Sequence, residues 1–315
     1  MKSLFSSVLL AFLTVRGAAA WGNLGHETVG YVAQQFLAPK ALSFVKSSLG
    51  AQYNESLGPA ATWADEVKSE AAFSWSSALH FVDAEDDPLH GSCSVSETRD
   101  CSNGRCILTA IANYTTRVQM TSLSAEQRQE ALKFIDHFLG DIGQPLHVEA
   151  LEAGGNDISA KCSGESSTNL HAVWDTGILT KHIDTSFNSN VQTYANSLVT
   201  RLKTGDFSKQ AASFISCSSI TEPASSKREL KDEIMELIIG RADNAITPLA
   251  CPLVWAADAN AFDCSFVFNF STGEDLCSGT YFSGAIPIID LQLAKQGFRL
   301  AAWLNVIFDG ATMLP

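Results

Sequence analysis

The amino-acid sequence predicts a mostly α-helical protein, with a single multi-helix domain over residues 21–315. Apolar residues recur at the 3.6-residue helical period in several well-separated segments. Alternating strand patterns flanked by Asn-Gly or Asp-Gly turns are scarce. No linker rich in glycine, serine or proline divides the chain, and no internal repeat or low-complexity tract interrupts it.

The first twenty residues are typical of a secretory signal peptide. Lys2 is followed by an apolar stretch from Leu4 to Val15, and small residues end the segment at Ala18–Ala20. This stretch is too short to span a bilayer, and no later one reaches about 18 uninterrupted apolar residues. We therefore expect cleavage after Ala20, and a soluble, secreted, extracellular protein that begins at Trp21 and has no membrane partner.

Four segments carry the helical pattern. In residues 26–37, the side chains of Val29, Val32 and Phe36 share one face. Residues 124–143 begin with a capping-box pattern, Ser124 to Gln127, and end at a glycine with Pro145 just beyond. Two further amphipathic helices are predicted over residues 227–246 and 289–308. Residues 78–86 form at most a short extended piece.

Eight cysteines in an exported chain predict disulfides rather than zinc ligands, because an oxidising compartment favours the bridge. Cys101 and Cys106 lie five positions apart around an Asn-Gly pair, a spacing that closes a tight loop, so we expect them to pair. Spacing alone leaves the other pairings open. Three sequons predict N-glycosylation at Asn54, Asn113 and Asn269.

The formal net charge of −13 argues against a protein that binds long duplex DNA by neutralising its phosphates. It permits a short anionic substrate that is held by metal ions, because the ions supply positive charge. It is also the charge of an ordinary soluble protein without such a partner. A monomer is the default expectation.

Two pairs of the form H-x-x-x-D indicate a metal site. His137 and Asp141, like His171 and Asp175, lie four residues apart, so each pair projects from one face of a helix. Either pair alone is equally typical of a surface ion pair. His147 follows a helix-breaking proline and is free to turn toward a second ion. Zinc favours this mixture of imidazole nitrogen and carboxylate oxygen.

Other potential ligands stand apart from these pairs. Asp65 is followed three residues later by Lys68, and His80 lies in a separate segment. Cleavage after Ala20 would free the α-amine of Trp21, five residues before His26. An α-amine has a pKa of about 7.7–8.0 and therefore binds metal more readily than a lysine does.

These residues lie in segments that resemble the single-strand-specific zinc nucleases of fungi and plants, whose fold is shared with bacterial zinc phospholipases C. The resemblance runs through almost the whole mature chain. The matching segments are WGNLGHETV (21–29), TWAD (62–65), HFVDA (80–84), KFIDHFLGDIGQPLH (133–147), EAGGND (152–157), TNLHAVWD (168–175) and WAADAN (255–260).

The resemblance implies three zinc ions per chain. It places one ion with Asp65, His80, His137 and Asp141. It places a second with His147, His171 and Asp175. The third would take the amine and carbonyl of Trp21, His26 and the other oxygen of Asp141, which would thus bridge two ions. The region 205–250 is longer than is usual in these nucleases, and we expect its Cys217 and Cys251 to form a bridge of their own.

The implied activity is cleavage of single-stranded DNA and RNA to 5′-phosphorylated products, with 3′-nucleotidase activity. A hydroxide shared by two zinc ions would attack phosphorus while a flanking zinc stabilises the leaving 3′ oxygen. Asp65 would orient the water, and Lys68 would stabilise the phosphoryl charge. The resemblance makes Phe81 a stacking platform for a base, with Asp83 and Asn156 bonded to its edge. Three of these residues also have an ordinary structural role open to them: Lys68 as a solvated surface lysine, Phe81 as a core residue and Asp83 as a turn residue.

Two other functions stay open at this point. A lipid phosphodiesterase of the same superfamily would apply the same zinc chemistry to a phosphocholine head group. A secreted zinc-binding protein without catalytic activity is the second alternative. The base-pocket residues disfavour the first, and the presence of Asp65 and Lys68 disfavours the second.

Overall fold

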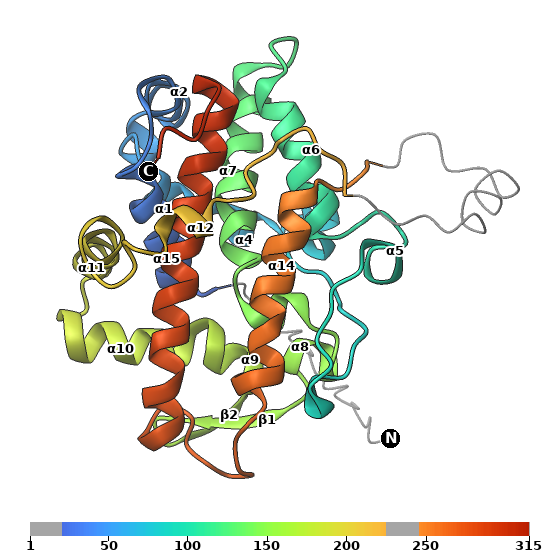
Figure 1. The fold of residues 1–315 in the computed structure, drawn as a ribbon, viewed down its shortest axis with the longest axis vertical. Helices are drawn as coiled ribbons and strands as arrows, with labels where there is room; N and C mark the ends of the chain where they lie inside the picture. Colours follow the sequence, from blue (N-terminus) through green and yellow to red (C-terminus); the bar gives the residue numbers. More distant parts are fainter. Residues whose placement is uncertain (1–20, 225–245, 315) are drawn as a thin grey trace, which may run out of the picture.

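The computed structural model describes residues 21–224 and 246–314, and these residues are mostly helical, as predicted (Figure 1). The predicted signal peptide lies outside the described residues, and so does nearly all of the helix predicted over 227–246. Helices make up most of the described part, and a single two-stranded hairpin lies at one end of it (Figure 1).

Three of the predicted helices are present. Helix α1 spans Asn23–Gln34 and α7 spans Ala125–Asp141. The capping box of α7 is formed, because Ser124 Oγ accepts from Gln127 N at 3.2 Å and Gln127 Oε1 accepts from Ser124 N at 3.1 Å. Helix α15, Gly279–Asp309, begins ten residues earlier than the predicted 289–308. It continues through Pro287, although a proline inside a helix removes a backbone hydrogen bond and usually kinks or ends the helix.

The remaining elements are all shorter than α7 and α15. The longer helices among them are α2 (Pro39–Leu49), α6 (Ile107–Gln119), α10 (Ile178–Phe187), α11 (Val191–Lys203) and α14 (Ala250–Phe262). The short α-helical turns are α3 (Leu57–Ala60), α4 (Trp63–Val67), α5 (Glu97–Asp100), α8 (Glu152–Gly155), α9 (Leu170–Ala172) and α12 (Ala211–Phe214). The 3₁₀ turns are η1 (Ala51–Tyr53), η2 (Ser74–Leu79), η3 (Pro88–His90) and η4 (Pro145–Val148). Two π-helical turns, η5 (Val173–Gly177) and η6 (Asp263–Val267), follow α9 and α14.

Helix α15 is the scaffold on which α1, α2 and α7 pack (Figure 1). Its apolar side chains lie in a continuous core that also contains Trp174 and Trp255, and both indoles are fully buried. Its C-terminal end holds the start of α2 by hydrogen bonds. Asn305 Oδ1 accepts from Ala38 N at 2.7 Å, and a carboxylate oxygen of Asp309 accepts from Ala41 N at 2.8 Å.

A hairpin that the sequence analysis did not predict joins β1 (Ser159–Cys162) to β2 (Glu165–Asn169). Its two turn residues, Ser163 and Gly164, have φ of 53° and 86°, and positive φ at both positions matches the twist of paired strands. The strands are too short to show a clear alternation, and the turn is Ser-Gly rather than Asn-Gly. Residues 78–86 contain the end of η2 and no strand.

All eight cysteines are paired. Cys101 bonds to Cys106 and Cys217 bonds to Cys251, so both expected bridges are confirmed. The other two pairs are Cys162–Cys277 and Cys93–Cys264. In the described residues, no helix has the length and apolar character that crossing a membrane requires.

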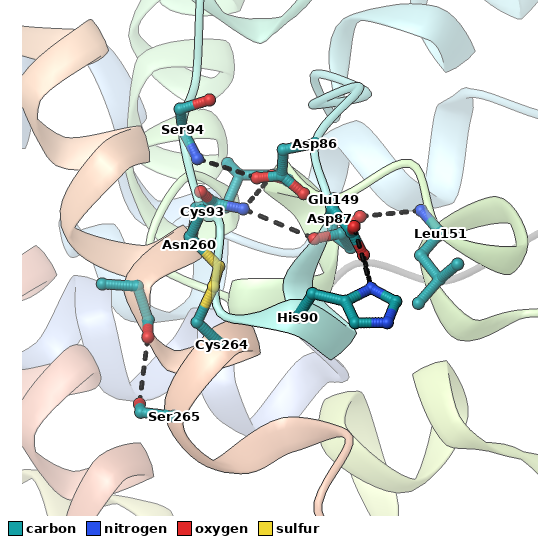
Figure 2. Close-up of a disulfide and its surroundings, with 12 residues drawn as sticks. Asp86, Asp87, His90, Cys93, Ser94, Glu149, Leu151, Asn260, Cys264 and Ser265 are labelled. Carbon is teal, nitrogen blue, oxygen red and sulfur yellow. Dashed lines mark hydrogen bonds and ion pairs between the residues drawn. A yellow bond between two sulfur atoms is a disulfide. The ribbon is translucent and has the colours of Figure 1, made fainter.

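The Cys93–Cys264 bridge ties an irregular loop to the π-helical turn after α14 (Figure 2). Next to it, Ser94 N donates to Asp86 Oδ2 at 2.8 Å (Figure 2). The buried Glu149 lies close by and accepts from Leu151 N at 2.8 Å (Figure 2). The disulfide thus fixes the loop beside the segment that follows His147.

We predict that the disulfide closing a long loop contributes much more to the free energy of unfolding than the one closing a short loop. The C93A/C264A variant should lose about 5 kcal/mol of unfolding free energy, because the bridge closes a loop of 171 residues. The C101A/C106A control should lose only about 2 kcal/mol, because its cysteines are separated by 5 residues. Equilibrium denaturation in urea measures both values, and equal losses would contradict the prediction.

Candidate metal centre

Eight of the predicted ligand side chains converge in the interior of the protein, although they come from segments between residues 26 and 175. Seven of them are buried and Asp65 is nearly so. The eight are His26, Asp65, His80, His137, Asp141, His147, His171 and Asp175. Such a concentration of ionisable groups in a low-dielectric core is costly unless a cation or mutual pairing compensates it.

Helix α7 supplies the central pair. His137 Nε2 and Asp141 Oδ2 lie 3.2 Å apart, one helical turn from each other. His80 Nδ1 approaches the same oxygen at 3.1 Å, while His26 Nε2 lies 3.2 Å from the other oxygen, Oδ1. The two oxygens of Asp141 therefore face different histidines. A bridging carboxylate requires this arrangement.

Helices α1 and α7 approach closely at this point because α7 carries a glycine. A Cβ atom at Gly140 would lie 3.0 Å from Nδ1 of His26. The ring of His26 is stacked on that of His137, with centroids 3.7 Å apart. A larger residue at position 140 would push the His26 ring away from the cluster.

Three of the histidines are oriented by backbone carbonyls. Nδ1 of His137 lies 2.6 Å from Ala61 O, Nδ1 of His147 lies 2.9 Å from His80 O, and Nδ1 of His171 lies 2.7 Å from Gly154 O. A protonated Nδ1 that donates to a carbonyl leaves Nε2 with its lone pair. In metal sites this hydrogen bond fixes both the tautomer and the ring orientation of a ligating histidine.

The carbonyl that holds His171 belongs to an unusual turn. Residues 152–155 all have positive φ, including the non-glycine residues Glu152 and Ala153. Gly154 is required here for a second reason, because a Cβ atom would lie 2.5 Å from Leu146 O. Strain of this kind persists where the surrounding structure imposes it, commonly at functional sites. The turn orients His171 and carries Asn156 at its end.

The second H-x-x-x-D pair lies on α9 and the π-helical turn η5. His171 Nε2 and Asp175 Oδ2 are 3.1 Å apart, and His147 Nε2 lies 3.6 Å from Asp175 Oδ1. Gln144, which is fully buried, donates from Nε2 to Asp175 Oδ1 at 2.6 Å and accepts from Leu146 N at 2.7 Å. It thereby links the carboxylate to the turn that carries His147.

Three groups of ligand atoms are close enough to share an ion, with all atoms of a group within 4.8 Å of one another. The groups are His26, Asp65 and His137; His80, His137 and Asp141; and His147, His171 and Asp175. The third is the predicted second set. The first two groups differ from the predicted ligand sets, because His26 is grouped with Asp65 and His137 instead of with Asp141 and the Trp21 amine. The assignment of each side chain to an ion therefore stays a prediction.

The donor set fits metal ions. Several buried donor and acceptor atoms of the cluster have no hydrogen-bond partner among the described residues, including Nε2 of His80, His147 and His171. Buried polar atoms without a partner are rare in folded proteins and need an explanation. A cation that coordinates them provides one. These clusters can therefore hold metal ions.

Within the cluster, buried carboxylates and imidazoles shift each other's pKa values. Burial alone would raise the pKa of Asp141, but the charges of His137, His26 and His147 outweigh it and hold that pKa well below its ordinary value. Conversely, burial lowers the pKa of His137, but Asp141 and Asp65 outweigh it and raise that pKa to about 10. For His80, burial dominates and lowers the pKa to about 4, which keeps the imidazole neutral at physiological pH.

Trp21 lies beside this cluster. Its side chain is fully buried, and the backbone N–H of the next residue, Gly22, donates to Asp175 O at 2.8 Å. The expected start of the mature protein therefore lies next to the segment that carries the predicted ligand Asp175. Coordination by the Trp21 amine stays a prediction.

A cavity of about 550 Å³ opens onto the cluster. His80, His147 and His171 line it, together with the four predicted substrate and catalytic residues Lys68, Phe81, Asp83 and Asn156. The Phe81 ring is 37% exposed. Burial, together with Glu85 and Asp100, raises the pKa of Asp83. The structure therefore brings all four residues to one cavity.

The remaining predicted catalytic residue, Asp65, contacts the cluster and also Lys68, which lines the cavity. Lys68 Nζ lies 2.6 Å from Asp65 Oδ1, as expected for side chains three residues apart. His137 Nε2 and His80 Nδ1 lie 3.4 and 3.5 Å from the same oxygen. Burial opposes the charged form of Asp65, but His137, His26 and Lys68 outweigh it and hold the pKa of Asp65 well below its usual value.

The sequence analysis missed two polar residues at this site. Gln144 stands within the HFLGDIGQPLH stretch, and its position between two ligands was the available signal. Glu149 lines the cavity, and burial raises its pKa to about 7, with a further contribution from Asp86. The predicted glycosylation sites lie elsewhere: Asn54 and Asn269 are exposed and Asn113 is half-buried.

We predict that Gln144→Leu weakens metal binding by roughly 10- to 100-fold, because Asp175 Oδ1 loses its donor. Gln292→Leu is the matched control, because this buried glutamine donates to Gly143 O, next to Gln144, without contacting a predicted ligand. Competition with a fluorescent chelator gives both affinities. Equal affinities for the two variants would refute the role of Gln144.

Comparison with known proteins shows that the sequence matches a family of nucleases. The sequence model of S1/P1 nucleases matches residues 21–309. Nuclease P1 of Penicillium citrinum is 39% identical over 291 residues, which cover 91% of this chain and 97% of that protein. Nuclease S1 of Aspergillus oryzae is also 39% identical over 291 residues, covering 91% of each. Endonuclease 3 of Arabidopsis thaliana is 31% identical over 314 residues, covering 98% of this chain and 96% of that protein.

The matched span starts at Trp21 and contains every predicted metal ligand. The resemblance drawn from the separate sequence segments is thereby confirmed, together with the mostly α-helical fold that it implied. The chain belongs to the S1/P1 nuclease family.

Proposed function

We propose that this chain is a secreted zinc-dependent endonuclease that cleaves single-stranded DNA and RNA to 5′-phosphorylated products. We propose further that it releases phosphate from 3′-nucleotides. The observation that supports this most directly is the cavity, where buried imidazole ligands meet Lys68, Phe81, Asp83 and Asn156. Membership of a nuclease family supports the same reaction class.

Zinc is the metal that this donor set favours. The three clusters combine imidazole nitrogen with carboxylate oxygen, a mixture typical of catalytic zinc, and no thiol is available because the cysteines are paired. When bound, zinc lowers the pKa of water and stabilises negative charge on phosphoryl and leaving-group oxygens. The residues that would hold it are the eight side chains of the cluster and the amine of Trp21.

Asp65 and Lys68 would act directly on the reacting groups. The carboxylate of Asp65 remains ionised because of its cationic neighbours, so it can accept a hydrogen bond from the attacking water and orient it. Lys68 Nζ lies 2.6 Å from that carboxylate and lines the cavity, and its positive charge would stabilise the negative charge that develops on the phosphoryl oxygens. Both groups are positioned before substrate arrives.

The preference for single strands follows from the cavity. A phosphate can reach buried ligands only if the neighbouring base leaves its stack, and an unpaired base does so at lower cost. The exposed Phe81 ring follows His80 directly in sequence and offers such a base a stacking surface. Asp83 and Asn156 would accept and donate hydrogen bonds at its edge.

The decisive experiment measures cleavage of single-stranded DNA before and after chelation. We expect activity to disappear with the metal and to return with zinc, with about three zinc ions per chain measured by mass spectrometry of the metal content. A metal-free protein that retains full activity would rule out the proposal. Release of phosphate from adenosine 3′-monophosphate, measured beside hydrolysis of phosphatidylcholine, separates a nuclease from a lipid phosphodiesterase.

An N-terminal extension gives a sharper prediction. One residue left ahead of Trp21 should reduce cleavage by at least about 100-fold, because an amide replaces the amine that would bind the third ion. The control carries the same residue at the C-terminus. Wild-type activity in the extended protein would refute the role of the amine while leaving the other two sites intact.

A further inference from the structure

A second cavity, of about 250 Å³, lies between α6 and α7 and shares no lining residue with the cavity at the metal cluster. One wall is aromatic and the rest is polar. Its lining residues include Trp75, Asn113, Tyr114, Arg117, Gln127 and Glu130. None of them is a predicted metal ligand or substrate-binding residue, so the cavity has no part in the proposed reaction.

Trp75 is the prominent feature of this cavity. In the described residues, only Trp75 and Phe81 are exposed aromatic side chains, with exposed fractions of 45% and 37%. The indole is nevertheless held in place. Its Nε1 donates to Ala72 O at 2.8 Å, and its centroid lies 5.9 Å from that of the buried Phe134. The indole is therefore partly exposed in a fixed position, where its face can pack against a ligand in the cavity.

The same cavity contains a glycosylation sequon. Asn113 lines it, and the sequence Asn113-Tyr114-Thr115 fits the Asn-X-Ser/Thr pattern. Thr115 is buried and its Oγ1 accepts from Trp303 Nε1 at 2.9 Å, so a glycan has to be attached before α6 packs. Because Asn113 and Trp75 line the same small cavity, a sugar attached to Asn113 would lie close to the indole.

We propose that Asn113 carries an N-glycan whose first N-acetylglucosamine lies in this cavity against the face of Trp75. The proposal rests on the secretory export proposed above. In the attachment step, Nδ2 of Asn113 forms a bond to the anomeric carbon of a lipid-diphosphate-linked oligosaccharide. The amide nitrogen loses one proton, and the lipid diphosphate leaves with the bonding electrons of the broken C–O bond.

The cavity suits a neutral sugar. The positive C–H face of a pyranose packs on the negative face of an indole. Arg117, Gln127 and Glu130 supply hydrogen-bond donors and acceptors for its hydroxyl and acetamido groups. With each water occupying about 30 Å³ of liquid volume, a space of 250 Å³ is large enough for one sugar ring.

A nucleic-acid strand fits less well. Binding of a strand to such a surface depends on clustered positive charge. Here Arg117 is accompanied by Glu130 in the cavity wall, and the chain as a whole has a formal net charge of −13. The charges at the cavity are balanced, so they favour an uncharged ligand.

The test uses the full chain expressed through a glycosylating secretory pathway, with N54Q and N269Q leaving Asn113 as the last sequon. Endoglycosidase H leaves the first sugar, and peptide N-glycosidase F removes it and converts Asn113 to aspartate. We expect the Tm to be unchanged by trimming and to fall by about 2 °C on complete removal. The N113D variant controls for the new charge and should match the fully deglycosylated protein.

A double-mutant comparison assigns the effect to the indole. In W75A, complete removal of the glycan should change the Tm by much less than 2 °C, while W75F should retain part of the difference. Comparing each variant with its own deglycosylated form excludes any general loss of stability. If complete removal of the glycan lowers the Tm of W75A as much as that of the parent protein, the proposal is wrong. It is also wrong if W75A leaves the glycan effect on Tm unchanged and instead reduces cleavage of long single strands, because Trp75 would then bind nucleic acid.

Mass spectrometry of the wild-type chain separates this inference from the proposed export. If Asn54 or Asn269 carries sugar while Asn113 does not, the glycan inference alone is wrong. If the protein is secreted and all three asparagines lack sugar, the glycan inference is wrong and the proposed export stands. If the protein is not secreted at all, the export on which the inference rests is refuted, while the proposed nuclease reaction is still tested by the chelation experiment.

Discussion

The burial of eight ionisable ligand groups at one point of the core is the constraint on which the rest of the structure depends. Asp141 at its centre contacts His26, His80 and His137, from three separate parts of the chain. The free energy needed to bury these groups is large unless cations bind or the groups pair with one another. The surrounding elements hold the groups together against that cost.

The scaffold meets this requirement through close helix packing and through hydrogen bonds from backbone carbonyls to ligand side chains. Helix α7 carries two ligands, and α1 approaches it closely enough to stack His26 on His137 because position 140 is glycine. Three carbonyls set the ring orientations of His137, His147 and His171. One of these carbonyls belongs to a left-handed turn, so local backbone strain is part of how the site is built.

The cavity above the cluster explains how an acidic protein can act on a polyanion. The formal charge of −13 repels nucleic acid at long range, so attraction has to be local. Lys68 and cations bound by the clusters would provide it at the scissile phosphate, and Phe81 would add stacking that does not depend on charge. Trp75 marks a separate surface, where balanced charges favour a sugar.

The sequence by itself determined the helical class and the main helices α1 and α7, because helical period is a local property. Through the family resemblance it also named the eight side chains that converge in the cluster. It also determined the Cys101–Cys106 bridge, whose partners are five residues apart. Only the tertiary structure decided the Cys93–Cys264 and Cys162–Cys277 bridges, the way the histidines share the carboxylates, and the contact of Gln144 with Asp175. It also decided the hairpin and the extension of α15 through Pro287, where packing outweighs local preference. These features depend on distances between segments far apart in the chain, which no local pattern records.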